Sequence, residues 1–421
     1  MDSGNTAFLL IAAALVLLMT PGLAFFYGGL VKAKSVISMM MMSFGAIGLI
    51  GVLWVLYGYA IAFPGAEGTI FAWSVDPGAF GLNNLLEVAD DAVYPPLAFA
   101  AFQATFAIIT VALVSGAIAD RAKFGSWLIF AGLWATLVYF PVASWVFNFG
   151  LADDGSFAYG GWLTHGLQDA IGVGVIDFAG GTAVHINAGA AALALALVLG
   201  KRVGFGKGVS VPHNPPFVLL GAGLLWFGWF GFNAGSELAA DGTAALAFIN
   251  TLAAPAAALL GWIIVEKLKD GKATSVGAAS GAVAGLVAIT PACGSLHPVW
   301  AIVLGIVAGA VCALAIDLKF KLGFDDSLDV VGIHLVGGLI GTLYLGFFAN
   351  GSGLLWSGSF NQLLVQAIAA FSVMAYSFVL AFGIGFLIEK TIGFRIKNED
   401  ELAGVDLVVH GEEGYVLADT K

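Results

Sequence analysis

The distribution of lysine and arginine constrains this chain more than any other feature of its sequence. Long apolar stretches divide it into eleven segments, at residues 7–31, 36–63, 95–119, 125–147, 171–199, 217–236, 244–265, 273–292, 298–318, 330–349 and 361–388. All 16 basic residues follow odd-numbered segments, and the gaps after the even-numbered segments contain none. Since the cytoplasmic loops of membrane proteins collect Lys and Arg, this alternation predicts eleven transmembrane helices, with the N-terminus outside and the C-terminus inside.

The composition supports an all-α integral membrane protein. Hydrophobic residues make up 60% of the chain and charged residues 10%, and the mean hydropathy is +0.97. Most segments reach the ~20 residues that a helix needs to cross a bilayer. The net charge of −11 comes without any basic patch, so we expect no nucleic-acid partner. The two cysteines, Cys293 and Cys312, support neither a disulfide framework nor a metal site, and we find no cofactor motif.

Eleven spans divide naturally into five, five and one. A repeat with an odd number of spans inverts its second copy, as in inverted-repeat transporters. We therefore expect a transmembrane domain over residues 1–390, with repeats at about 7–200 and 217–350 and a last helix at 361–388. Residues 391–421 form a cytoplasmic tail. His185 in the fifth segment and His334 in the tenth are the two histidines well inside spans, and the repeat predicts that they lie near the middle of the bundle.

Ionisable residues inside a membrane are costly and are candidates for function. Apart from the two histidines, Asp177 lies in the fifth segment, while Glu237 and Asp329 stand at segment ends. A pair of neutral imidazoles could share a proton and offer hydrogen bonds in a narrow pore. Two histidines without a convergent Cys or carboxylate set make a poor zinc site. For Asp177 two interpretations stay open: a helix cap, or a carboxylate that stabilises a passing cation.

Aromatic residues gather at the outer ends of two segments. Phe232 and Ser236 are four residues apart on one helix face, and Phe102 and Phe106 have the same spacing in the third segment. A hydroxyl above a ring offers a small cation one hydrogen bond and a cation–π surface. The pattern therefore predicts a cation-binding site at the outer mouth, although aromatic residues at a membrane interface are also common anchors.

Three motifs resemble the Amt/Mep/Rh superfamily, and specifically the bacterial and archaeal Amt ammonium transporters. They are Asp177-Phe-Ala-Gly-Gly-Thr-Ala-Val-His185, Gly228-Trp-Phe-Gly-Phe-Asn-Ala-Gly-Ser236 and Asp325-Asp-Ser-Leu-Asp329-Val-Val-Gly-Ile-His334. The resemblance covers nearly the whole chain. It implies a homotrimer with one pore in each subunit, placed in the plasma membrane and serving nitrogen uptake. The implied substrates are ammonium, ammonia and methylammonium.

The resemblance also implies residue roles. The pore histidines are His185 and His334, the outer gate is Phe106 and Phe232, and Ser236 recruits ammonium beside Asp177. Ammonium loses its proton at the outer vestibule and ammonia crosses a hydrophobic pore, with net charge movement in many members.

One position departs from the family pattern. Aligned on Pro141, the place of the usual recruiting tryptophan holds Phe147, and Trp145 stands two residues earlier. Phenylalanine is a weaker cation–π partner than tryptophan, so the affinity of recruitment is open.

The tail resembles the regulatory C-terminus of this family. The matching residues are Gly393, Arg395, Asp406, His410 and Tyr415. Such tails dock on the cytoplasmic pore mouths and take part in binding PII-type signal proteins, which the resemblance makes possible partners here.

Three alternative functions differ in kind from transport of ammonium. A transporter-like ammonium sensor would signal through the tail, but these residues contain no recognisable output domain. A different channel, such as a urea or water pore, is the second alternative, but the paired Asn-Pro-Ala motifs expected of water channels are missing. An intramembrane enzyme would need a positioned nucleophile, a metal set or a cofactor motif, so we do not expect an enzyme.

Overall fold

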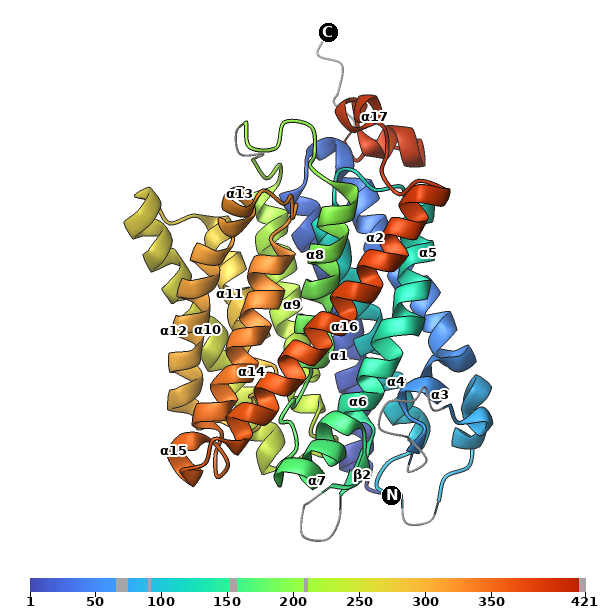
Figure 1. The fold of residues 1–421 in the computed structure, drawn as a ribbon, viewed down its shortest axis with the longest axis vertical. Helices are drawn as coiled ribbons and strands as arrows, with labels where there is room; N and C mark the ends of the chain where they lie inside the picture. Colours follow the sequence, from blue (N-terminus) through green and yellow to red (C-terminus); the bar gives the residue numbers. More distant parts are fainter. Residues whose placement is uncertain (66–74, 90–91, 152–156, 208–210, 416–421) are drawn as a thin grey trace.

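The computed structural model describes residues 1–65, 75–89, 92–151, 157–207 and 211–415. It is a bundle of helices that run along its longest axis, with the N-terminus at one end and the tail at the other (Figure 1). We call these the outer end and the inner end, after the predicted orientation. Within the described residues, ten helical stretches are long and apolar enough to cross a membrane.

The first half of the bundle precedes the 200–214 connection. Its helices are α1 (Ser3–Leu30), α2 (Val36–Leu53), α3 (Tyr59–Ala62), α4 (Pro96–Val114), α5 (Phe124–Trp134), α6 (Phe140–Phe147), α7 (Leu167–Ile171) and α8 (Asn187–Leu199). Two strands, β1 (Phe149–Leu151) and β2 (Phe157–Gly160), form an antiparallel pair in the outer loop. Single π-helical turns join α2 to α3 and α5 to α6, so each pair forms one continuous span.

The second half and the tail contain the remaining helices. They are α9 (Pro215–Gly235), α10 (Gly242–Asp270), α11 (Ser275–Ile289), α12 (Pro298–Ala315), α13 (Leu318–Leu322), α14 (Val336–Phe348), α15 (Leu354–Ser357), α16 (Asn361–Thr391) and α17 (Asn398–Ala403). The eighth predicted segment corresponds to α11, which at 15 residues is shorter than the other spans. The count of eleven spans and their orientation therefore stay predictions.

Close helix contacts depend on small residues. The helices α1 and α9, which open the two predicted repeats, pack along one another. A β-carbon on Gly221 of α9 would lie 2.2 Å from the backbone nitrogen of Phe26 in α1, so only glycine fits there. A β-carbon on Gly189 of α8 would lie 2.5 Å from the backbone nitrogen of Leu335. Glycine lets helix backbones approach in this way in lipid, where apolar burial alone gives little drive for association.

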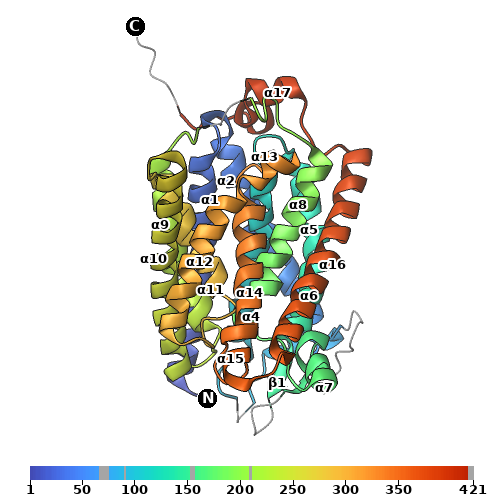
Figure 2. The ribbon, with the colours of Figure 1, turned by 60° about the vertical axis from the view of Figure 1, so that its left-hand side comes forward.

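The last long helix links the two halves. In Figure 1 α16 crosses the bundle diagonally, and Figure 2 shows it again at one edge. It packs against α8 and α5 of the first half and against α14 of the second. This arrangement is compatible with the predicted repeats, which nevertheless stay a prediction.

One predicted boundary is wrong. The fifth segment was expected to be helical from residue 171, but helical structure begins at Gly181. Gly172 and Gly180 adopt positive φ angles of 90° and 115°, which side chains rarely tolerate, and they break the helix. Asp177 therefore lies before the helix and not on the same helical face as His185.

Candidate functional site

Two histidines meet in the middle of the bundle. His185 and His334 are 1% and 3% exposed. Their Nδ1 atoms lie 3.2 Å apart, and their ring centroids are 5.3 Å apart at an angle of 27°. One ring nitrogen must donate and the other accept, so the contact suits two neutral imidazoles. The structure thus brings together the pair that the sequence singled out.

Each histidine sits in a π-helical turn at the start of its helix. His185 belongs to the turn Gly181–Ile186, which leads into α8, and His334 belongs to the turn Val331–Leu335, which leads into α14. Such turns are often found at functional sites because the extra residue re-aims a side chain. Here both turns direct imidazoles to the same place.

Buried aspartates cap both of these turns. The Asp177 carboxylate accepts hydrogen bonds from the backbone nitrogens of Gly181, Thr182 and Ala183, and from the Thr182 hydroxyl. Burial raises the pKa of the Asp177 carboxyl, and these hydrogen bonds offset part of that rise. Asp177 is thus a cap, one of the two interpretations that the sequence left open.

The second cap was missed at the sequence level. Asp326 Oδ2 accepts a hydrogen bond of 2.7 Å from the Val331 nitrogen. Asp326 precedes His334 by eight residues, the same spacing as from Asp177 to His185. That repeated spacing is the signal that could have found it.

Stacked rings lie between the histidines and the outer end. The rings of Phe106 from α4 and Phe232 from α9 are 4.0 Å apart and almost parallel, at 12°. On the inner side Phe232 lies 6.3 Å from the His185 ring, and on the outer side Phe106 lies 6.4 Å from the Phe147 ring. Trp229, another residue that sequence reasoning did not single out for this site, stacks against His185 at 5.4 Å. The rings form a continuous aromatic path.

An outer cavity of about 360 Å³ opens beyond this path. Four of the predicted recruitment residues line it, namely Phe106, Phe147, Asp177 and Ser236. The Ser236 hydroxyl donates a hydrogen bond of 2.8 Å to the Phe232 carbonyl, which leaves its oxygen lone pairs available. Trp145 does not line the cavity, since its ring packs on Trp162 and Tyr376. The geometry therefore favours Phe147 over Trp145.

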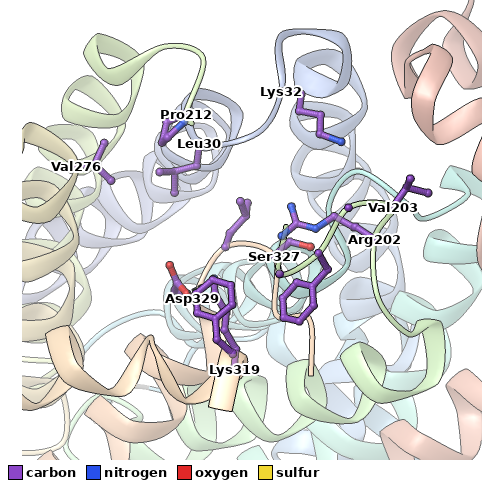
Figure 3. A pocket seen from close by; sticks show the side chains of 14 residues that line it. Leu30, Lys32, Arg202, Val203, Pro212, Val276, Lys319, Ser327 and Asp329 are labelled. Carbon is purple, nitrogen blue, oxygen red and sulfur yellow. Dashed lines mark hydrogen bonds and ion pairs between the residues drawn. The ribbon is translucent and has the colours of Figure 1, made fainter. Parts of the chain in front are cut away.

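An inner cavity of about 260 Å³ lies at the opposite end (Figure 3). Two of its three basic residues form ion pairs: Lys319 Nζ lies 2.5 Å from Asp329, and Arg202 lies 2.9 Å from both Asp325 and Asp120, whereas Lys32 is in none of the ion pairs among the described residues. Although burial opposes ionisation, the Arg202 contacts lower the pKa of the Asp325 carboxyl. The inner mouth thus carries a fixed network of opposite charges.

The tail packs against the inner end. The Asp406 carboxylate accepts hydrogen bonds from the backbone nitrogens of Ile37 and Ser38, at 3.0 and 2.7 Å, and so caps α2. The Arg395 guanidinium binds the Leu199 carbonyl and the Glu401 carboxylate, each at 2.9 Å. These contacts tie the tail to the inner ends of α2 and α8.

Three further predicted tail residues also make contacts at the inner end. The Tyr415 hydroxyl lies 2.8 Å from His213 Nε2, and the His410 ring lies 5.3 Å from the Phe124 ring. The Gly393 carbonyl accepts a hydrogen bond of 2.7 Å from the Ser126 hydroxyl. Gly393 itself has a φ of 76°, which allows the chain to turn after α16.

Comparison with known proteins shows the family to which the chain belongs. A family model described as Ammonium Transporter Family matches residues 7–415. The chain is 54% identical to an ammonium transporter of Mycobacterium tuberculosis, over 99% of this chain and 91% of that protein. A solved chain named Sensor Amt Protein is similar with a TM-score of 0.86 and 28% identity, over 97% and 98% of the two chains. Mep2 of Candida albicans gives a TM-score of 0.84 and 32% identity, over 99% and 91%.

Proposed function

We propose a route for ammonium through this chain, which belongs to the ammonium transporter family. The observation that carries the proposal is the unbroken series of rings from the outer cavity to the buried histidine pair. Ammonium is recruited in the outer cavity, loses its proton there, and crosses as ammonia.

Recruitment rests on the lining of the outer cavity. The Ser236 oxygen accepts a hydrogen bond from the cation, and the rings of Phe106 and Phe147 offer cation–π surfaces. Asp177 acts indirectly, because its carboxylate holds the turn that carries His185. Trp145 contributes by packing and not by contact with the cation.

Deprotonation follows from desolvation. The stacked Phe106 and Phe232 rings close the path to water, and both are 1% exposed. Taking a cation out of water disfavours its charged form, so ammonium gives a proton to water in the outer cavity before it passes the rings. Ammonia then meets two neutral imidazoles, His185 and His334, which offer hydrogen bonds without a fixed charge. Potassium has no proton to lose and is excluded.

The proton crosses separately, so that transport moves net charge. His185 Nε2 is buried without a hydrogen-bond partner among the described residues, and its Nδ1 faces the Nδ1 of His334. A pair of imidazoles in contact can take up a proton on one side and release it on the other. We propose that the proton released in the outer cavity passes to His185 and then to His334, and that each imidazole returns to its neutral form before ammonia crosses.

Assembly and regulation are further parts of the proposal. The family resemblance supports a homotrimer in the plasma membrane that serves nitrogen uptake. The docked tail, with Asp406 on α2 and Arg395 on the end of α8, offers a PII-type protein a surface beside the inner mouth. We therefore propose residues 391–421 as the regulatory segment.

A sensor role is the second candidate and is less favoured. The similarity to a chain named Sensor Amt Protein supports it. The relative at 54% identity is named an ammonium transporter, and the chain is nearer to it than to the sensor. Membership of a transporter family likewise argues against an enzyme.

Uptake of labelled methylammonium by liposomes containing the purified full chain tests transport. We expect uptake that ammonium competes away, with the label recovered unchanged. Uptake no faster than in empty liposomes would overturn the transport proposal and favour the sensor, and a modified label would indicate an enzyme.

A further inference from the structure

One carboxylate of the outer cavity has no place in the proposed route. Glu237 follows Ser236 directly and lines the same cavity as Phe147 and Asp177. The last turn of α9 continues through it, since the Glu237 nitrogen donates to the Ala234 carbonyl at 3.3 Å and the Leu238 nitrogen to Gly235 at 3.0 Å. The backbone thus holds Glu237 at the cavity in a fixed position beside the recruiting hydroxyl.

Glu237 has no cationic partner in the described part of the chain. None of the ion pairs there includes it, and the residues that line the cavity contain no Lys, Arg or His. Its charged neighbour is Asp241, which has the same sign and to which Glu237 can hydrogen-bond only while a proton lies between the two carboxyl groups. Burial and this neighbour raise the pKa of the Glu237 carboxyl to about 7. The cavity thus holds negative charge that no protein cation balances.

Capping of the next helix does not explain this carboxylate. The N-cap of α10 is Asp241, which accepts hydrogen bonds from the nitrogens of Thr243 and Ala244 at 2.9 and 3.0 Å. A half-buried carboxylate beside another carboxylate is unfavourable for folding. A shared proton relieves the repulsion between Glu237 and Asp241, and when both are ionised a small cation in the cavity can take the place of that proton.

We propose that Glu237 is a cation-binding carboxylate of the outer cavity and sets the affinity of the chain for ammonium. The inference rests on the proposed function and adds a residue to it. Ammonium can donate several hydrogen bonds at once, and Ser236 supplies one acceptor. Glu237 supplies a charged acceptor, which makes a stronger bond than a neutral one. This bond also compensates for the ring of Phe147, which is a weaker cation–π partner than a tryptophan would be.

The test is the concentration dependence of ammonium-evoked current in liposomes that contain the full chain. Glu237→Gln keeps the size of the side chain and removes the charge. We expect the apparent KM for ammonium to rise about tenfold or more, because a hydrogen bond to a charged group is lost. The maximal current should stay within about twofold, because the pore itself is unchanged.

Three further variants keep the test specific. Asp169→Asn removes an outer carboxylate that is 65% exposed and does not line the cavity, and its KM should be unchanged. Glu237→Asp should keep most of the affinity. Phe147→Trp in the Glu237→Gln background should recover part of it, through a stronger cation–π surface.

The outcomes separate the inference from the function on which it rests. An unchanged KM in Glu237→Gln overturns the role of Glu237 while leaving ammonium transport intact. A fall in maximal current with constant KM would assign Glu237 a structural role, and also overturns the inference. If the unaltered chain gives no ammonium current, the proposed function fails first. If the Glu237→Gln variant does not insert into the liposome membrane, Glu237→Asp becomes the test. A markedly raised KM for ammonium in Glu237→Asp would contradict the inference.

Discussion

The Nδ1 atoms of His185 and His334 face one another at 3.2 Å in the buried centre of the bundle. The two residues are 149 positions apart in the chain, and each stands in a π-helical turn that a buried aspartate caps. Both imidazoles are buried, so water cannot solvate either one, and its charged form is costly there. The resting pair is therefore suited to an uncharged molecule and holds a proton only in passing.

Replacement of one imidazole should relax selectivity. In His185→Ala we expect a potassium current of at least about a tenth of the ammonium current, because water fills the space and hydrates a passing cation. Current on a solid-supported membrane measures this. His165→Ala, which changes an outer histidine beside Asp169, is the matched control and should stay selective. A His185→Ala variant that remains strictly ammonium-selective would refute the role assigned to the histidines.

Loss of an aspartate cap should disturb the histidine that it positions. Asp177→Asn keeps the shape of the side chain but removes the negative charge of the carboxylate. The backbone nitrogens of Gly181, Thr182 and Ala183 donate their hydrogen bonds to that carboxylate. We expect at least about a tenfold loss of ammonium current and a lower Tm, since hydrogen bonds to charged groups are the stronger ones. Asp326→Asn should act in the same direction through His334. Normal current in the Asp177 variant would show that the cap is dispensable.

The affinity for ammonium should depend on pH through Glu237. Its pKa is about 7, above the ordinary value, so protonation removes its charge as the pH falls through 7. Asp241, at the start of α10, raises this pKa by its charge and by a side-chain hydrogen bond, and Asp177 is the other titratable residue among those that line the cavity. We expect KM to rise about tenfold between roughly pH 8 and pH 6. In Glu237→Gln the dependence should be nearly flat, and an equal slope in both chains would point to another group.

Removal of the tail carboxylate should loosen α2. Asp406→Ala deprives the nitrogens of Ile37 and Ser38 of their acceptor, which for an N-cap costs about 1 kcal/mol. Amide hydrogen exchange at these two positions should then be about fivefold faster. Asp400→Asn in the first turn of α17 is the control, because its side chain makes none of these contacts. Unchanged exchange would mean that the tail does not hold the helix.

Much of the fold could be predicted because the bilayer leaves few choices. Backbone groups must be satisfied within each span, and charge fixes the gaps between spans, so the apolar segments coincide with helices over most of their length. The fifth segment is the instructive exception. Hydropathy does not distinguish an apolar loop from an apolar helix, and the loop from Gly172 to Gly180 is apolar because most of it is buried or half-buried against the rest of the protein, although Gly172 itself is exposed.

The site was predicted less completely, for reasons of the same kind. Periodicity and the family motifs brought out His185 and Phe232, but Trp145 and Phe147 are two residues apart and only the path of the chain decides which one faces the cavity. Asp326 stands next to Asp325, and the sequence gives no sign that one pairs with Arg202 while the other caps a helix. Such differences depend on side-chain direction, which composition does not encode.

The most direct test of the proposed route is the current evoked on a solid-supported membrane by an ammonium pulse. Purified, unaltered chain in liposomes receives the pulse, with an equal potassium pulse as the control and an internal pH dye as a second readout. The route predicts a transient current with ammonium and none with potassium. An equal current with both cations would contradict the proton loss at the outer cavity. A pH change without current would contradict the separate passage of the proton.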